Sequence, residues 1–168
     1  LLLMTAEASV NTNSMIHGIL DDWNYASRSL YTDPSPAIKT LVDQTKQESD
    51  TFYRLENLDP ISPNDSINYG YSGISLFSSI RNRNSSSYLD SLGFRSRGTN
   101  LNIRYANNTL LMDGFTGIKY NIAKNDSSFS KYGFAKESQS GEYTLYKNLN
   151  ALPLAFTAPL SINKVEQP

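Results

Sequence analysis

A predicted strand gives way to a polar loop rich in glycine and tyrosine between residues 51 and 79, and this stretch constrains the fold more than any other. Residues 52–56 have the aromatic and apolar content of a strand. The Asp59-Pro60 pair and the Ser-Pro-Asn-Asp sequence at residues 62–65 are typical of turns, so the strand ends before them. Residues 68–73 then place two glycines beside two tyrosines, which lets the backbone bend while aromatic faces stay available. The stretch is therefore either the wall of a binding site or a loop packed by its own side chains.

The length and the charge of the chain limit its possible functions. A chain of 168 residues with 39% hydrophobic content is expected to form one domain with its own core, because chains of this size bury roughly 70% of their unfolded surface. The net charge of −1 gives no electrostatic surface for nucleic acid, so no nucleic-acid partner is expected. The sequence has no cysteine, which excludes disulfides, thiolate metal sites and cysteine nucleophiles.

Motifs that bind cofactors or metals are absent from the sequence. It contains no P-loop, no dinucleotide-binding fingerprint, no zinc-binding His-Glu-x-x-His and no EF-hand. Gly70 and Gly73 alone are too weak a pattern to indicate phosphate binding. The single histidine, His17, has no local partners for a catalytic or metal site, so we interpret it as a polar structural residue. We expect no cofactor, no metal and no catalytic residue in this chain.

Helix and strand patterns occur along the whole chain. The clearest helix is predicted to begin with Ser35 as its N-cap and Pro36 in its first turn, and to end near residue 47. These patterns predict an α+β fold with a mostly antiparallel sheet of about four to six strands, flanked by a few short helices. The other predicted elements are a mixed helical segment at 11–31, a helix capped within 84–86 and ended by Gly93, a helix from Asn107 to Gly114, and strands at 117–123, 132–137, 143–147 and 154–158, with a hairpin connection at 138–141.

The first ten residues, LLLMTAEASV, form a short apolar run. The run is too short to cross about 30 Å of hydrocarbon, and it lacks the basic region of a signal peptide. Residues 1–10 are therefore either the end of a preceding transmembrane helix with its linker or the start of an ordinary helix or strand. Residues 11–168 are expected to form a single domain.

Short motifs after residue 50 occur in an order that resembles the soluble extracytoplasmic part of the YfhO family of bacterial polytopic membrane proteins. Each motif alone is a short structural pattern, and it is the ordered set that carries the resemblance. The motifs are FYR (52–54), NDS (64–66), YGYSGIS (69–75), FSS (77–79), GIKY (117–120), LYKN (145–148) and ALPLAF (151–156).

This resemblance implies a role at the cell membrane of Gram-positive bacteria. The chain would be an extracytoplasmic domain of a membrane-embedded glycosyltransferase, which uses a lipid-linked sugar to glycosylate cell-envelope polymers such as teichoic acid. Its partners would be its own transmembrane portion and, as ligands, the lipid-linked sugar or the polymer. The catalytic carboxylate would belong to the membrane portion, so the chain by itself is expected to transfer no sugar. The resemblance also favours the transmembrane interpretation of residues 1–10.

The stretch from residue 51 to 79 is also where we predict ligand contact, at Arg54, Asn64, Asp65, Tyr69 and Tyr71. A sugar ring presents apolar C–H faces and a fringe of hydroxyls, so its site needs aromatic planes beside fixed donors and acceptors. The alternative is structural, with Arg54 and Asp65 paired to hold the loop while the tyrosines fill the core.

Three further hypotheses stay open. Arg95, Arg97 and Arg104 form the densest basic cluster, which is either an anion site or a solvated loop. The chain as a whole is alternatively a structural or scaffolding domain of a transporter-like membrane protein, with no role in sugar binding. A free-standing hydrolase is the third class, and it needs two carboxylates about 5 to 10 Å apart, a pair that the sequence does not single out.

Overall fold

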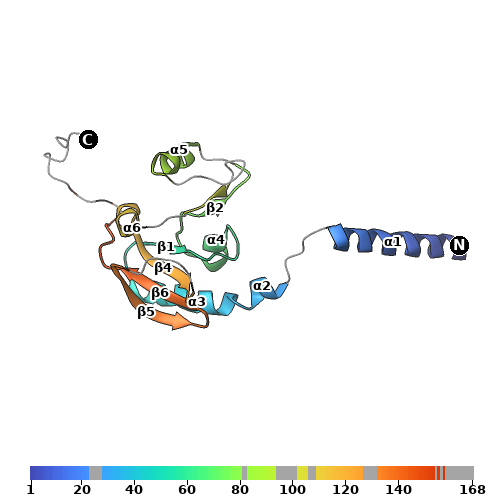
Figure 1. Ribbon diagram of the computed structural model, residues 1–168, viewed down its shortest axis with the longest axis horizontal. Coiled ribbons are helices and arrows are strands. Elements are labelled where there is room, and N and C mark those ends of the chain that lie inside the picture. Colours follow the sequence, from blue (N-terminus) through green and yellow to red (C-terminus); the bar gives the residue numbers. More distant parts are fainter. Residues whose placement is uncertain are drawn as a thin grey trace. The chain divides into compact units, whose positions relative to one another are not determined.

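The computed structural model describes residues 1–22, 28–80, 83–93, 102–105, 109–126 and 132–153, together with Ala155 and Thr157. The chain divides into two units, Leu1–Asp33 and Pro34–Pro168. The first unit contains helices, and the second contains both sheets and the remaining helices (Figure 1).

The first unit consists of α1 (Leu2–Asp22) and α2 (Arg28–Thr32). α1 is continuous across residue 10, where the sequence suggested a boundary. The hydroxyl of Thr5 donates to the Leu2 carbonyl at 2.9 Å, so this polar group is satisfied within the helix. Large apolar side chains of α1 are exposed, from 46% at Ile19 to 87% at Leu3. Among the residues described, no helix combines the length and the apolar character needed to cross a membrane.

A four-stranded sheet forms the centre of the second unit, in the order β1-β4-β6-β5. β1 pairs with β4 in parallel, whereas β6 pairs antiparallel with both β4 and β5. The prediction of an α+β fold with a mostly antiparallel sheet is thereby confirmed. The strands are β1 (Arg54–Asn57), β4 (Ile118–Lys124), β5 (Phe134–Ser140) and β6 (Tyr143–Asn148), and a separate antiparallel pair is formed by β2 (Leu76–Phe77) and β3 (Asn102–Ile103).

α3 (Ser35–Glu48) supplies the helical side of the main core. Its Ile38, Leu41 and Val42 are at most 1% exposed, and they pack against apolar side chains of the central strands. Because successive residues of a strand point to opposite faces, these strands present one apolar face to the core. The strand residues of this core are Leu55, Tyr120, Ile122, Tyr143 and Leu145.

The start of α3 differs from the prediction by one residue. Pro34, rather than Ser35, occupies the N-cap position, and its carbonyl accepts a hydrogen bond from the Ile38 N–H at 3.1 Å. Proline fixes φ near the helical value. Pro34 and Pro36 together therefore let the helix begin without the side-chain cap that was expected from Ser35.

α6 (Leu110–Thr116) contacts β4 and β6, and it also corrects a predicted boundary. Its N-cap is Thr109, whose side chain accepts from the Met112 N–H at 3.2 Å, whereas the expected cap, Asn107, lies outside the described residues. The helix continues through Gly114, where a Cβ would come within 3.1 Å of the Asn150 carbonyl oxygen. It ends instead at Gly117, whose φ of 74° favours glycine.

α5 (Arg83–Ser91) and β5 lie within a few residues of their predicted positions. α5 is followed by Gly93 with φ of 89°, as expected for a helix stop. β5 runs on to Ser140, so the hairpin connection is shorter than the predicted 138–141 and centres on Gly141. Of the strand predicted at 154–158, only Ala155 and Thr157 are described, and neither is in a strand. α4 (Asp65–Tyr69) lies where only a loop was expected.

Candidate functional site

Asp65, one of the predicted ligand contacts, holds the loop that follows β1. Its carboxylate accepts hydrogen bonds from the Asn57 amide and the Ile61 N–H at 3.0 Å, and from the Ser62 N–H at 2.9 Å. The side chain is 2% exposed. Burial raises the pKa of Asp65, and these three hydrogen bonds oppose that rise. Asp65 is therefore a structural anchor, and we call the segment at residues 58–73, which contains α4, the Asp65 clasp.

Asn64 and the two tyrosines also belong to the Asp65 clasp. The Asn64 side-chain oxygen accepts from the Phe77 N–H at 2.8 Å and so ties α4 to β2. Tyr69 is 5% exposed within the main core. Tyr71 packs against the same core, and burial together with the neighbouring carboxylates raises the pKa of its hydroxyl. These side chains thus make contacts within the protein.

Gly73 serves close packing within the clasp. A Cβ at this position would lie 3.1 Å from the Ser66 Cβ and 3.3 Å from a Glu56 carboxylate oxygen. Contacts this short require neighbours to move, so glycine is the residue that fits.

Arg54 is separated in its contacts from the other predicted residues. Its guanidinium donates to the Thr116 carbonyl at 2.6 Å, and it lies 5.4 Å from the centroid of the Phe52 ring. The ion pair with Asp65 that formed part of the structural alternative is not present, because both residues use other partners. The structure thus brings Asn64, Asp65, Tyr69 and Tyr71 together around α4, and assigns Arg54 to another surface.

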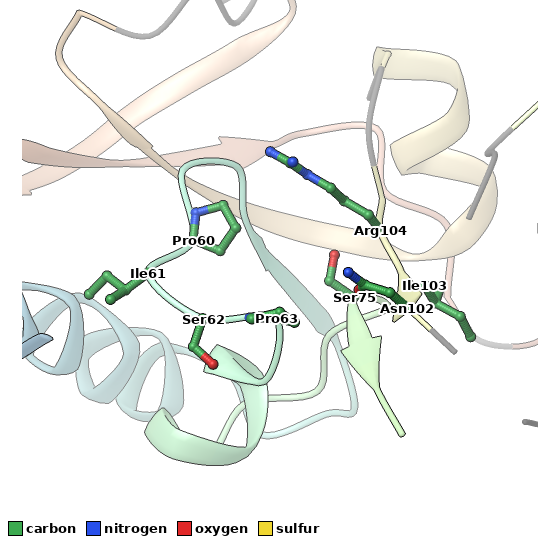
Figure 2. A pocket seen from close by; sticks show the side chains of 8 residues that line it. All are labelled: Pro60, Ile61, Ser62, Pro63, Ser75, Asn102, Ile103 and Arg104. Carbon is green, nitrogen blue, oxygen red and sulfur yellow. The ribbon is translucent and has the colours of Figure 1, made fainter. Parts of the chain in front are cut away.

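A small pocket lies beside the Asp65 clasp (Figure 2). Its volume is about 210 Å³, and Figure 2 shows the loop from Pro60 to Pro63 on one side with Ser75 and Asn102 on the other. Arg104 extends over the same space. The remaining lining residues are Ile61, Ser62 and Ile103. We call this space the clasp pocket.

Internal hydrogen bonds fix both walls of the clasp pocket. Asp65 holds the N–H groups of Ile61 and Ser62 on one wall. On the other wall, the Ser75 hydroxyl accepts from the Tyr105 N–H at 3.1 Å. The pocket therefore combines a guanidinium, an amide and hydroxyls with apolar proline and isoleucine surface. Arg104 belongs to the predicted basic cluster, whose other members, Arg95 and Arg97, lie outside the described residues.

Comparison with known proteins identifies the family of the chain. The family described as "Bacterial membrane protein YfhO" matches residues 1–168. This chain belongs to the YfhO family. No curated protein and no solved structure matches it. As a YfhO-family chain, it is part of a family of bacterial membrane proteins.

The motifs that suggested the YfhO family meet around the sheet and the clasp. FYR leads into β1, NDS begins α4, and YGYSGIS ends α4 with the left-handed Gly70. GIKY opens β4, and LYKN lies within β6. The ordered motifs of this YfhO-family chain thus mark a folding unit of β1, α4, β4 and β6.

Two buried carboxylates of this YfhO-family domain were not predicted from the sequence. Glu56 is 1% exposed, and its carboxylate accepts from the Ile74 N–H at 2.8 Å and the Ser75 N–H at 3.4 Å. Asp113 is fully buried, and it accepts from the Tyr105 hydroxyl at 2.7 Å and the Asn121 amide at 2.6 Å. The sequence contained a signal for each burial. Glu56 is an acidic residue inside a strand pattern, and Asp113 is an acidic residue inside an apolar helix stripe.

These two carboxylates make polar contacts inside the fold. Burial raises the pKa of Glu56 to about 7, and the charge of Asp113 adds to the rise. The hydroxyl and amides around the two groups satisfy them from within the fold. Within the described ranges, no three histidine, aspartate or glutamate side chains gather in a way that could hold a metal ion.

Proposed function

We propose that this chain is an extracytoplasmic domain of a bacterial membrane glycosyltransferase, which uses a lipid-linked sugar to glycosylate cell-envelope polymers such as teichoic acid. The observation that carries the proposal is the match to the YfhO family over residues 1–168. The domain is an accessory part, and its own transmembrane portion provides the transferase centre. The deep burial of Glu56 and Asp113 supports this division of labour, because a catalytic carboxylate must reach its substrate.

We further propose that the clasp pocket contacts sugar. Sugar hydroxyls need donors and acceptors in fixed positions, and Arg104, Asn102 and Ser75 provide such groups beside apolar surface. Asp65 then serves the site by holding the Pro60–Pro63 wall, Asn64 ties α4 to β2, and Tyr69 and Tyr71 support α4 from the core. Of the five contacts predicted from the sequence, Arg54 is the one assigned to a separate surface.

The test is polymer glycosylation in bacterial cells that produce the membrane protein with altered clasp pockets. Arg104→Ala and Asn102→Ala each remove a ligand donor, and Arg83→Ala on α5 is the matched control, since Arg83 is exposed and lies outside the pocket. We expect each pocket variant to lower glycosylation per molecule of protein about tenfold, as for the loss of one hydrogen bond to a sugar. The control is expected to match the unaltered protein.

A scaffolding function is the second candidate, and the internal contacts of Tyr69 and Asp65 favour it. Under this function the pocket variants leave glycosylation unchanged, whereas variants that unfold the clasp lower it only in step with the amount of protein in the membrane. Unchanged glycosylation in both Arg104→Ala and Asn102→Ala would therefore reject the sugar contact.

A further inference from the structure

Two hollows of the second unit meet at Arg54. The first, of about 310 Å³, is lined by Arg54 of β1, Tyr88 of α5 and Phe115 of α6. The second, of about 450 Å³, is lined by Phe52 and Lys119 among others. The guanidinium of Arg54 in the first hollow lies 5.4 Å from the Phe52 ring centroid in the second, so the two hollows adjoin. We call them together the Arg54 groove, whose lining residues come from α5, α6, the start of β1, the start of β4 and the segment after β6.

The turn between α6 and β4 also belongs to both hollows. Thr116 lines the first and Gly117 lines the second. A Cβ at Gly117 would lie 3.6 Å from an Arg54 guanidinium nitrogen. The Arg54 guanidinium thus lies beside the turn whose residues line both hollows.

The groove contains two cations that have no carboxylate partner within the described part of the chain. Arg54 donates to a neutral carbonyl, and Lys119 donates to the Ser49 hydroxyl at 3.0 Å. Lys119 also lies 5.4 Å from the Tyr120 ring centroid, a contact that restricts the ammonium without neutralising it. Elsewhere Lys39, Lys124 and Lys147 each pair with an acidic side chain. The Arg54 groove is therefore complementary to negative charge.

Exposed aromatic rings accompany these cations. Phe52 is 56% exposed, and Tyr88 and Phe115 are each 51% exposed. Aromatic faces stack on the apolar faces of sugar rings, while guanidinium and ammonium groups bind phosphate or carboxylate. Cations and rings occur together in both of the adjoining hollows, and this arrangement suits an extended ligand more than a single small molecule.

We propose that the Arg54 groove binds an anionic carbohydrate chain, whose negative groups are phosphates or carboxylates. Arg54 and Lys119 contact the negative groups, and Phe52, Tyr88 and Phe115 stack on the sugar or polyol units. The proposal rests on the proposed function in one respect, namely that the ligand is a polymer which the membrane protein modifies. The groove is separate from the clasp pocket, so the polymer and the transferred sugar occupy different surfaces.

Arg54 is held ready for such a ligand by its existing contacts. The Thr116 carbonyl and the Phe52 ring restrict its side chain, which lowers the entropy lost on binding. Ionic contacts between partly exposed groups, such as Arg54 and Lys119, are weakened by salt. Binding in the groove is therefore expected to fall as ionic strength rises, and a contact made only by stacking would not show this dependence.

The experiment measures binding to the purified 168-residue chain by calorimetry, independently of any glycosylation. The probes are a glycerol-phosphate oligomer and a uronic-acid oligosaccharide, which distinguish phosphate from carboxylate as the source of charge. A neutral glucan oligomer, inorganic polyphosphate and vesicles of anionic lipid are the comparison ligands. The variants are Lys119→Gln, Phe52→Ala and Arg54→Gln, and the matched control is Lys136→Gln on β5, which lies outside the groove.

We expect at least one anionic oligomer to bind more tightly than every comparison ligand. Lys119→Gln and Arg54→Gln are each expected to weaken this binding about tenfold, as for one charge-assisted hydrogen bond, and Lys136→Gln is expected to have no effect. Phe52 is exposed and Lys119 is partly exposed, so Phe52→Ala and Lys119→Gln are expected to keep the fold. These two variants therefore still test the proposal if Arg54→Gln unfolds the domain. Equal binding of polyphosphate or vesicles, or an equal loss in Lys136→Gln, would overturn the proposal. If the groove binds a polymer while the clasp-pocket variants glycosylate normally, the inference survives and the sugar contact fails.

Discussion

Glu56 is a buried acidic residue whose environment differs strongly from that of a free side chain. It alternates with Leu55 along β1, so it points away from the apolar core face and toward the loop at Ile74 and Ser75. Burial raises its pKa to about 7, although the Ser75 side chain and the two backbone N–H groups there hydrogen-bond the carboxylate and oppose the rise. A group that holds its proton more tightly in the folded state makes stability depend on pH.

We predict that the domain becomes less stable as the pH rises from 4.5 to 7. A glutamate in the unfolded chain has a pKa of 4.5, whereas the folded pKa of Glu56 is about 7. In this window the folded protein therefore keeps a proton that the unfolded chain has released. The contribution is complete below pH 4.5 and is lost as the pH approaches 7, and it amounts to at most about 3 kcal/mol. Urea unfolding near pH 5, close to the lower end of this window, and near pH 8, above the window, measures the loss of stability.

The variant Glu56→Gln distinguishes the contribution of this residue to the pH dependence from the contributions of the other titrating groups. The amide oxygen of glutamine can still accept from the Ile74 N–H, but the side chain has no proton to lose. The variant should therefore show a smaller difference in unfolding free energy between about pH 5 and about pH 8. An unchanged difference would mean that Glu56 has an ordinary pKa.

At the scale of elements, the short helix α4 is held by what surrounds it. Five residues are too few for a helix that is stable alone. Asp65 at its first turn binds three donors, Gly70 ends it in the left-handed conformation, and Lys46 of α3 donates to the Tyr69 carbonyl at 3.5 Å. The clasp is thus a rigid connection between β1 and β2.

We predict that Asp65→Ala destabilises the domain by about 2 to 4 kcal/mol, because three donors lose their acceptor in a buried place. Asp50→Ala is the matched control, since Asp50 is exposed and its loss should change stability little. Thermal unfolding followed by circular dichroism compares the two variants. Similar melting temperatures for Asp65→Ala and Asp50→Ala would show that the clasp contributes no stability.

At the scale of the whole molecule, the chain consists of two units whose surfaces differ in composition. Every buried residue that the structure describes lies between Ile38 and Asn148, within the second unit. The first unit contains no buried residue among those described, and its helix α1 exposes leucine, isoleucine and methionine side chains. The second unit therefore contains what it needs for independent folding.

We predict that a chain of residues 34–168 unfolds at the same temperature as the 168-residue chain. The core side chains of α3 and of the sheet all remain in this shorter chain, so no apolar burial is lost from the second unit. Differential scanning calorimetry measures both melting temperatures. A fall of more than a few degrees in the shorter chain would mean that residues 1–33 stabilise the second unit.

Patterns that act over a few residues carried the correct predictions. Pro36 and the apolar spacing of Ile38, Leu41 and Val42 sufficed for α3, because helix formation depends on neighbours three and four residues apart. Alternation sufficed for β4, in which Ile118, Tyr120 and Ile122 are buried as expected. The ordered motifs sufficed for the YfhO family, which the match over residues 1–168 confirms.

Only the tertiary structure decided which distant residues meet. β1 pairs in parallel with β4, which lies far along the chain, so Glu56 lies opposite Asn121 and near Asp113, and no local pattern contains that information. The same holds for Arg54, whose partner is the Thr116 carbonyl rather than Asp65. Sequence analysis identified the residue types a sugar site needs, but a hydrogen bond goes to whichever group the fold brings within about 3 Å. By itself, the sequence determined several of the longer elements and the family, whereas the strand order determined which polar groups are buried together and which line a surface.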